Sequence, residues 1–214
     1  MKNFLAIDTS GDYMSVVARK NGEFFSAFLP DCSMRHSVLL METIDSVLKR
    51  ANLKISECDF FATAVGAGSF TGIRIGISAT KGFALASSKP TLPVTSFDTL
   101  AYNTIDGVEI ASGKILCLIN ALHDCYYACG YENGKIVYPP AFLTEAEVLE
   151  LCGKGYALVS ATELPIATKA QVITVSPLEG LKNAVCALSQ NPQAFGELSA
   201  LYVRKSSAEM NVCK

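Results

Sequence analysis

The sequence is poor in the residues on which many catalytic sites depend. Its 214 residues include two histidines and no tryptophan. His36 and His123 lie far apart and cannot form a His-x-x-x-His metal motif on one helix. The chain also lacks the Gly-x-Ser-x-Gly elbow of serine hydrolases. We therefore expect neither a peptidase with paired histidine ligands nor a serine hydrolase.

The eight cysteines lack metal-binding spacing as well, because none forms a Cys-x-x-Cys pair. The nearest approach to a ligand set is His123, Cys125 and Cys129. If that stretch is a strand, a rise of roughly 3.3 Å per residue puts the two cysteines about 13 Å apart. Zinc needs thiolates within about 2.3 Å of one ion. We therefore predict buried, inert cysteines and no metal site.

Charge is also scarce. Charged residues make up 18% of the chain, the net charge is −2, and Arg204-Lys205 is the nearest thing to a basic patch. Unaided nucleic-acid binding usually needs a basic stripe, so we expect none here. Half of the residues are apolar. That excess favours a buried partner surface, or alternatively a compact α/β monomer rich in parallel strands.

Long apolar runs are missing too. The first run ends at Asp8, too early for a signal peptide, and no stretch approaches the roughly 20 apolar residues of a membrane span. We expect a cytoplasmic chain that does not contact membranes.

Strand and turn signals predict two similar halves. In the first we expect strands at residues 3–7, 14–20, 23–29, 59–65 and 91–95, and helices at 33–51, 71–86 and 96–102. In the second we expect strands at 114–119, 125–131, 135–138 and 156–160, and helices at 144–152 and 178–190. A shift of 112 residues places Asp8 on Asn120 and the hairpin turn Asn21-Gly22 on Asn133-Gly134.

This repeat predicts the architecture of actin, Hsp70 and the sugar kinases. We expect an α/β fold of two tandem RNase H-like, actin-like (ASKHA) lobes, each a mixed β-sheet with flanking helices, the second abbreviated. The expected domains are residues 1–105 and 106–214, with the last helix able to pack back on the first lobe. The analogy is one of fold, which does not determine function.

In enzymes of this architecture, ATP phosphates and their metal lie between the two first-hairpin turns. Asp8-Thr9-Ser10-Gly11 keeps the required acidic and small residues, whereas the turn after Asn120 has no carboxylate before Asp124 and no glycine. The chain also lacks a Gly-Gly dipeptide for adenosine. We therefore do not expect a self-sufficient ATPase. The residues of a vestigial nucleotide or phosphate loop would be Asp8, Thr9, Ser10, Gly66, Gly68 and Ser69.

The glycine-rich segment 66–76 follows a predicted strand and opens a helix, a context that suits anion binding. Its spacing is one residue too long for Gly-x-Gly-x-x-Gly, and no acidic residue follows at the distance that holds a ribose. The alternative is that the glycines serve the turn and close helix contacts.

The first two predicted helices, residues 33–51 and 71–86, carry more apolar residues than one sheet would cover. We therefore expect a helix-on-helix interface with another chain, the alternative being that both helices lie within the core. The expected interface residues are Met34, Leu40, Met41, Ile44, Val47, Gly72, Ile75, Gly76, Ala79 and Phe83. Leu40→Glu or Gly76→Phe would then break assembly and leave much of the fold intact.

Four segments resemble the TsaB (YeaZ) family of glycoprotease-like proteins, closely over residues 1–105 and weakly beyond. They are residues 6–10, 66–76, 93–101 and 201–204. The resemblance implies a tRNA-modification role as a subunit that pairs with a catalytic TsaD-like paralogue and a TsaE-like ATPase. Together these transfer a threonylcarbamoyl group to an adenosine of tRNA, making threonylcarbamoyladenosine. It also implies pairing through the two helices, self-association as a homodimer, and tRNA contact only through the complex.

The resemblance further implies that this chain is not catalytic alone. Ser96 and Leu100 stand where the paralogue carries metal-binding histidines, and neither can replace imidazole. The family's Asp-Ala-Arg is Asn120-Ala121-Leu122 here, and its Gly-Pro-Gly is Gly66-Ala67-Gly68. No cofactor is expected to be required. If a nucleotide binds, we expect ATP or ADP at the subunit interface. The open alternatives are an independent ATP-binding kinase-like enzyme, a glycoprotease-type peptidase, and a homodimeric scaffold.

Overall fold

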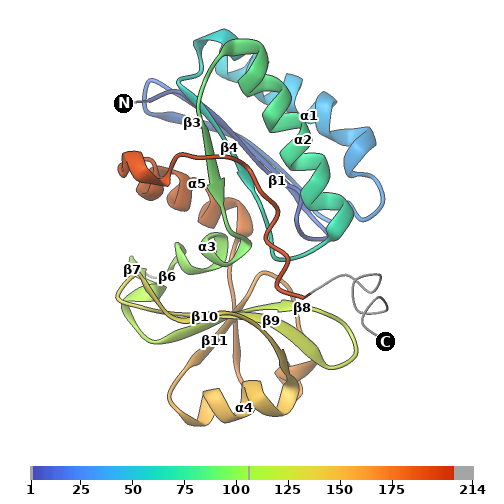
Figure 1. Cartoon of the computed structure of the whole chain (residues 1–214), viewed down its shortest axis with the longest axis vertical. Coiled ribbons are helices and arrows are strands. Elements are labelled where there is room, and N and C mark those ends of the chain that lie inside the picture. Colours follow the sequence, from blue (N-terminus) through green and yellow to red (C-terminus); the bar gives the residue numbers. More distant parts are fainter. Residues whose placement is uncertain (1, 106, 205–214) are drawn as a thin grey trace.

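The computed structural model describes residues 2–105 and 107–204 and contains two five-stranded mixed sheets (Figure 1). The two sheets have the same strand order, so the predicted repeat and the actin-like α/β class are confirmed. Lys205 and Cys213 lie outside the described residues. None of the helices that the structure describes has the length and apolarity of a membrane-spanning segment.

The first sheet has the order β3-β2-β1-β4-β5, with β1 antiparallel to β2 and parallel to β4. Its strands are β1 (Phe4–Asp8), β2 (Met14–Lys20), β3 (Glu23–Leu29), β4 (Phe60–Ala64) and β5 (Thr91–Val94). Asn21 and Gly22 both have positive φ, as the tight turn between β2 and β3 requires. The sheet therefore follows from local turn chemistry and apolar strands, as predicted.

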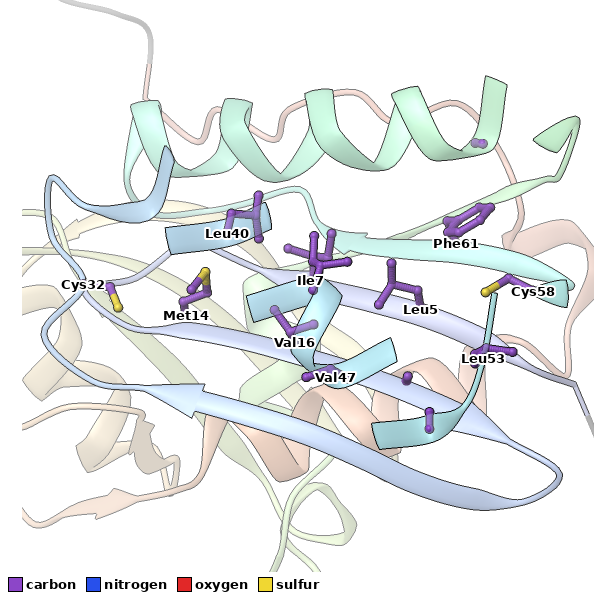
Figure 2. Close-up of a cluster of buried hydrophobic side chains, with 14 residues drawn as sticks. Leu5, Ile7, Met14, Val16, Cys32, Leu40, Val47, Leu53, Cys58 and Phe61 are labelled. Carbon is purple, nitrogen blue, oxygen red and sulfur yellow. The ribbon is translucent and has the colours of Figure 1, made fainter. Parts of the chain in front are cut away.

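Helices α1 (His36–Ala51) and α2 (Phe70–Ser87) run side by side over one face of this sheet (Figure 1). Figure 2 shows Leu40 and Val47 of α1 pointing into the same cluster as Ile7 and Val16 of the strands. This cluster is the main core of the first lobe. Helix α1 begins three residues later than predicted, and the Ser33 hydroxyl donates to Asp12 Oδ1 at 2.5 Å rather than capping the helix.

The second sheet has the order β10-β9-β8-β11-β12. Its strands are β8 (Ile115–Asn120), β9 (Cys125–Glu132), β10 (Lys135–Thr144), β11 (Ala157–Ser160) and β12 (Val172–Thr174), the last of which was not predicted. Helix α4 (Glu145–Gly153) has 9 residues where α1 has 16. The single turn η3 (Pro165–Thr168) stands where the first lobe has α2. The second lobe is therefore abbreviated, as predicted.

The last helix of each half crosses to the other lobe. Helix α3 (Ser96–Ala101) packs against the second sheet, and α5 (Pro177–Leu188) packs against β1, β2 and β5 of the first. The two helices approach so closely that a Cβ on Gly180 would lie 1.7 Å from the Thr99 carbonyl oxygen. A small hairpin of β6 (Thr104–Ile105) and β7 (Val108–Glu109) leads from α3 into the second half. The sheets are thus held together by exchanged helices.

The chain then returns to the first lobe as an extended segment, residues 195–203, which we call the strap (Figure 1). It directly follows the short turn η4 (Pro192–Ala194). Two similar turns, η1 (Ile55–Glu57) and η2 (Ile110–Ser112), lie in earlier connections. Leu198 and Ala200 of the strap pack against Ile73 and Ile77 of α2. The apolar side chains of Ile73 and Ile77 on α2 are therefore covered by the chain's own strap.

Candidate functional site

A cavity of about 340 Å³ lies between the lobes, where the turns after β1 and β8 meet. The first lobe and α3 contribute Ser10, Gly11, Asp12, Tyr13, Ala67, Gly68, Ser69, Ser96 and Leu100. The second lobe contributes Leu118, Ile119, Asn120, Ala121, Leu122, Tyr127, Ser160, Ala161 and Thr162. This is the position predicted for a cleft between two actin-like lobes.

The carboxylate of Asp8, the predicted metal anchor, is fully buried and bonded within its own turn. Its Oδ1 accepts hydrogen bonds from the Ser10 amide at 2.8 Å and the Ser10 hydroxyl at 2.7 Å, and its Oδ2 accepts from the Tyr13 hydroxyl at 3.3 Å. Burial raises the pKa of Asp8, and the Ser10 bonds oppose that shift. Because Ser10 and Tyr13 both line the cavity, they face it in place of the carboxylate.

Tyr13 also explains the glycine of this turn. A Cβ on Gly11 would lie 2.4 Å from Tyr13 Cε1, so only glycine lets the ring fold back over the turn. The ring is 8% exposed, and burial together with the charge of Asp8 raises the pKa of Tyr13 well above its ordinary value. The tyrosine thus fills the space beside the carboxylate, where a phosphate or a metal would have to approach.

Gly68 and Gly72 allow close contacts with the first turn, whereas Gly66 lies against the Leu201 carbonyl of the strap. A Cβ on Gly68, whose φ is +144°, would lie 2.2 Å from the Ser10 carbonyl oxygen, and one on Gly72 would lie 2.0 Å from that of Thr9. The Ser69 amide donates to the Ser10 carbonyl at 2.7 Å, and the Thr9 hydroxyl donates to the Gly72 carbonyl at 2.7 Å. These contacts explain Gly68 and Gly72 as residues that serve the turn and close helix contacts, which was the alternative to anion binding.

The second turn repeats the geometry of the first without its chemistry. Asn120 Oδ1 accepts from the Leu122 amide at 2.8 Å, the same bond and length that Asp8 Oδ1 makes with Ser10. Leu122, His123 and Asp124 then have φ of 66°, 52° and 54°, a left-handed turn without glycine. Leu122 is 67% exposed and lines the cavity.

A magnesium nucleotide, which the fold class implies for this cleft, does not fit these residues. Asp12 is the one carboxylate of the lining, and the lining has no lysine, arginine or histidine among the described residues. Asp12 Oδ1 already accepts from Ser33. Magnesium prefers several hard oxygen ligands, and buried phosphates need cations or free amides. The expected vestigial loop therefore lacks a charged anchor that faces the cavity.

Ser96 and Leu100, which stand where the resemblance places histidines of the catalytic paralogue, also line this cavity. The Ser96 hydroxyl donates to Ser10 Oγ at 2.8 Å, and Leu100 is buried in the core shared with the second sheet. The seven cysteines within the described residues are free, and burial raises the pKa of Cys129 to about 12. No group of three metal-ligating side chains occurs in the part of the chain that the structure describes.

The predicted partner interface requires correction at five residues. Leu40, Ile44 and Val47 are at most 2% exposed and belong to the first-lobe core. Gly72 and Gly76 are also buried; a Cβ on Gly76 would lie 2.6 Å from Thr9 Oγ1. These five residues contact their own sheet or the turn after β1, so they are unavailable to another chain. The expectation that Leu40→Glu or Gly76→Phe leaves the fold intact is therefore wrong.

The remaining interface residues do reach the surface. Met34 is 97% exposed and Met41 is 55% exposed, whereas Ile75, Ala79 and Phe83 are half-buried against the first-lobe core. Val38, which was not among the expected residues, is 75% exposed and lies three residues before Met41 on α1, whereas Met34 precedes the helix and has a φ of 65°. We call Met34, Val38 and Met41 the α1 stripe.

Fold and cleft together define a two-lobed α/β protein of the actin-like class whose first phosphate turn is occupied by its own side chains. The family model described as "TsaD: tRNA N6-adenosine threonylcarbamoyltransferase" matches residues 28–211. The chain belongs to this family, and its similarity to relatives named TsaB and YeaZ confirms the resemblance seen in the sequence.

Curated relatives carry the name "tRNA threonylcarbamoyladenosine biosynthesis protein TsaB". The protein from Haemophilus influenzae is 31% identical over 125 residues, which are 58% of this chain and 52% of the relative. The protein from Escherichia coli (strain K12) is 31% identical over 97 residues, 45% of this chain and 42% of the relative. The chain thus spans about half the length of the curated relatives it matches.

The structure of YeaZ from Pseudomonas aeruginosa has a TM-score of 0.73 with this chain, covering 94% of it and 100% of the YeaZ chain. Sequence identity between the two is 21%. The likeness therefore concerns the fold, including both lobes.

Proposed function

We propose that this chain is a non-catalytic subunit of the machinery that makes threonylcarbamoyladenosine in tRNA. It binds and supports a catalytic TsaD-like paralogue, works with a TsaE-like ATPase, and meets tRNA only through the assembled complex. The family membership and the names of the TsaB relatives support the pathway.

The main observation that supports the non-catalytic role is that the Asp8 carboxylate is buried and hydrogen-bonded within its own turn. The carboxylate that ends β1 is buried and receives hydrogen bonds from Ser10 and Tyr13 of its own turn. A carboxylate used in this way is bonded to its own turn and does not face the cleft where a metal would be held. The hydroxyl of Ser96 and the buried Leu100, where the paralogue has metal-binding histidines, point in the same direction.

The α1 stripe supports the pairing. Val38 and Met41, each more than half exposed, lie about one turn apart on α1, whose opposite face is already buried in the core, and the exposed Met34 lies just before the helix. Half-buried Ile75, Ala79 and Phe83 of α2 continue the apolar surface beside it. Such a two-helix surface fits an apolar helical face of a partner. A homodimer through the same surface is the form expected when the paralogue is absent.

The test is gel filtration with light scattering on this chain alone, and mixed with the catalytic paralogue of the same organism. We expect a heterodimer at micromolar concentration that Val38→Asp disrupts and Ser46→Glu preserves. Ser46 is exposed on the same helix but lies off the stripe. A heterodimer that tolerates Val38→Asp would refute the surface, and no mixed species with a folded paralogue would refute the pairing.

The pathway has a separate test. Deletion of the gene is expected to lower threonylcarbamoyladenosine in tRNA, and wild-type chain and the Ser46→Glu variant should restore it. Unchanged modification after deletion would contradict the role, and ATP turnover by the isolated chain would favour an independent enzyme.

A further inference from the structure

A second cavity, of about 430 Å³, lies where α3, α5, the β6–β7 hairpin and the β9–β10 turn meet. We call it the α3–α5 pocket. Tyr131 lines it near the end of β9, whereas Tyr127 of the same strand lines the interlobe cavity, and the two linings have none of the described residues in common. The volume falls in the range of ~300–1,000 Å³ typical of ligand pockets.

Hydrogen bonds join the elements that surround the α3–α5 pocket. Asn183 Nδ2 of α5 donates to the Tyr102 carbonyl at the end of α3 at 3.0 Å. The Gly134 amide of the β9–β10 turn donates to the Ala111 carbonyl of η2 at 3.0 Å. All four residues line the pocket. The pocket is therefore preformed, which reduces the entropy that a ligand has to overcome on binding.

Two tyrosines supply the aromatic surface of the pocket. Tyr131 is 2% exposed, and its hydroxyl donates to Asp98 Oδ1 at 2.9 Å, so its ring is held in place. Tyr102 is half-buried at the end of α3. Three other lining residues are small and apolar, namely Ala101, Ala111 and Ala187. The lining therefore suits a ligand that has a flat ring.

The charge of the pocket is negative. Glu109 of β7 is the one lining side chain that is charged at neutral pH among the described residues. Burial, followed by the charges of Asp98 and Glu109, raises the pKa of Tyr102, so both carboxylates act on this pocket. An ammonium group gains from nearby carboxylates and from the faces of tyrosine rings, whereas an anion is repelled. The pocket therefore favours a cation.

The Glu109 carboxylate is available to such a cation. Glu109 is exposed and forms no ion pair with the residues that the structure describes. Two cations of the same region have other partners. Arg19 Nη1 donates to Cys186 Sγ at 3.6 Å, and Lys182 Nζ pairs with Glu179 Oε1 at 2.8 Å. A ligand can therefore reach Glu109 without displacing an ion pair of this carboxylate.

We propose that the α3–α5 pocket binds a small organic cation of the arylalkylamine class, with its ring against Tyr102 and Tyr131 and its ammonium group facing Glu109. The site belongs to the isolated chain and is separate from the α1 stripe and the interlobe cavity. It goes beyond the proposed function, which needs no ligand here.

Calorimetric titration of the isolated full chain tests the proposal with three probes of similar shape. They are tyramine, its uncharged analogue para-propylphenol and its anionic analogue para-hydroxyphenylpropionate. We expect tyramine to bind about tenfold more tightly than para-propylphenol, and the anion to bind most weakly. Absence of tyramine binding at millimolar concentration overturns the proposal, as does equal affinity for tyramine and para-propylphenol.

Variants at exposed positions locate the site. Glu109→Gln should lower the affinity for tyramine about tenfold and leave that for para-propylphenol unchanged. Ala187→Phe fills the pocket and should abolish binding of both. Glu163→Gln, an exposed carboxylate outside the lining, is the matched control and should change neither. Full tyramine affinity in either Glu109→Gln or Ala187→Phe would place the cation elsewhere and overturn the proposal.

Discussion

The two lobes share a sheet and differ in what covers it. The first carries two long helices on one face, while the second carries the short α4 and the single turn η3. The turns after β1 and β8 have the same amide-to-side-chain bond, yet one begins at Asp8 and the other at Asn120. The second lobe thus keeps the strand order of the first although its helices are shorter and its turn has no carboxylate at Asn120. The exposed α1 stripe lies on the first lobe.

The largest expected effect comes from charging the helix–sheet core of either lobe. Leu40→Glu in α1 and Val148→Glu in α4 each bury an unpaired carboxylate, at a cost of about 3–5 kcal/mol. Because α3 and α5 are exchanged between the lobes, we expect each variant to shift one common unfolding transition in urea. Two separate transitions would show that the lobes fold independently. Met41→Glu, at the neighbouring exposed position, should change stability little.

The exchanged helices are tested next by Gly180→Val. The added side chain would overlap the Thr99 carbonyl and force α3 and α5 apart, at a cost of about 1–3 kcal/mol in urea unfolding. Gly82→Ala in α2 is the matched control, because its Cβ meets nothing within 4 Å. The alanine should raise stability by up to about 1 kcal/mol. Unchanged stability of Gly180→Val would mean that the two helices are not tightly packed.

Asp8→Asn makes the first turn resemble the second. Burial raises the pKa of Asp8 in the folded chain, so the folded form holds this proton more tightly than the unfolded form. Asp8 therefore favours folding below its unfolded pKa of about 3.9, and that contribution is lost as pH rises through the folded pKa. We expect Asp8→Asn to be more stable than wild type at neutral pH, with a smaller loss of stability above pH ~4. Unfolding by urea across this range measures both, and an unchanged pH profile would contradict the role of Asp8.

The smallest expected effect concerns the strap. The strap packs on α2 of the first lobe, and the second lobe has only the single turn η3 at the corresponding position. Tyr202 stacks on Phe70 with centroids 5.0 Å apart, and its hydroxyl accepts from Arg74 Nε at 2.9 Å. Tyr202→Ala should lower the free energy of unfolding by about 1 kcal/mol, as expected for one stacked and hydrogen-bonded aromatic at the surface. Glu197→Gln, which loses an exposed ion pair with Lys81, should have less effect. Equal losses in both variants would assign no special role to the stack.

Several features could be predicted because their causes are local. The Asn21-Gly22 turn, the apolar strands of the first sheet and the 112-residue shift all depend on neighbours in the sequence. Strand β12 was missed because its three residues are too few and too exposed to show a pattern. The start of α1 was placed too early because the partner of Ser33 is Asp12, which is distant in sequence.

The features of the candidate site likewise divide into those with local causes and those that depend on contacts between distant residues. The sequence by itself determined the class of fold and the scarcity of histidines and charged side chains, and it singled out Asp8, Ser10 and segment 66–76, whose role in a site stays a prediction. Only the tertiary structure decided that Tyr13 covers Asp8, that the glycines admit the first turn, and that Leu40 is buried while Met41 is exposed. A helical wheel records angle alone. Whether an apolar face meets its own sheet, its own strap or open solvent is decided by contacts between residues far apart in the chain.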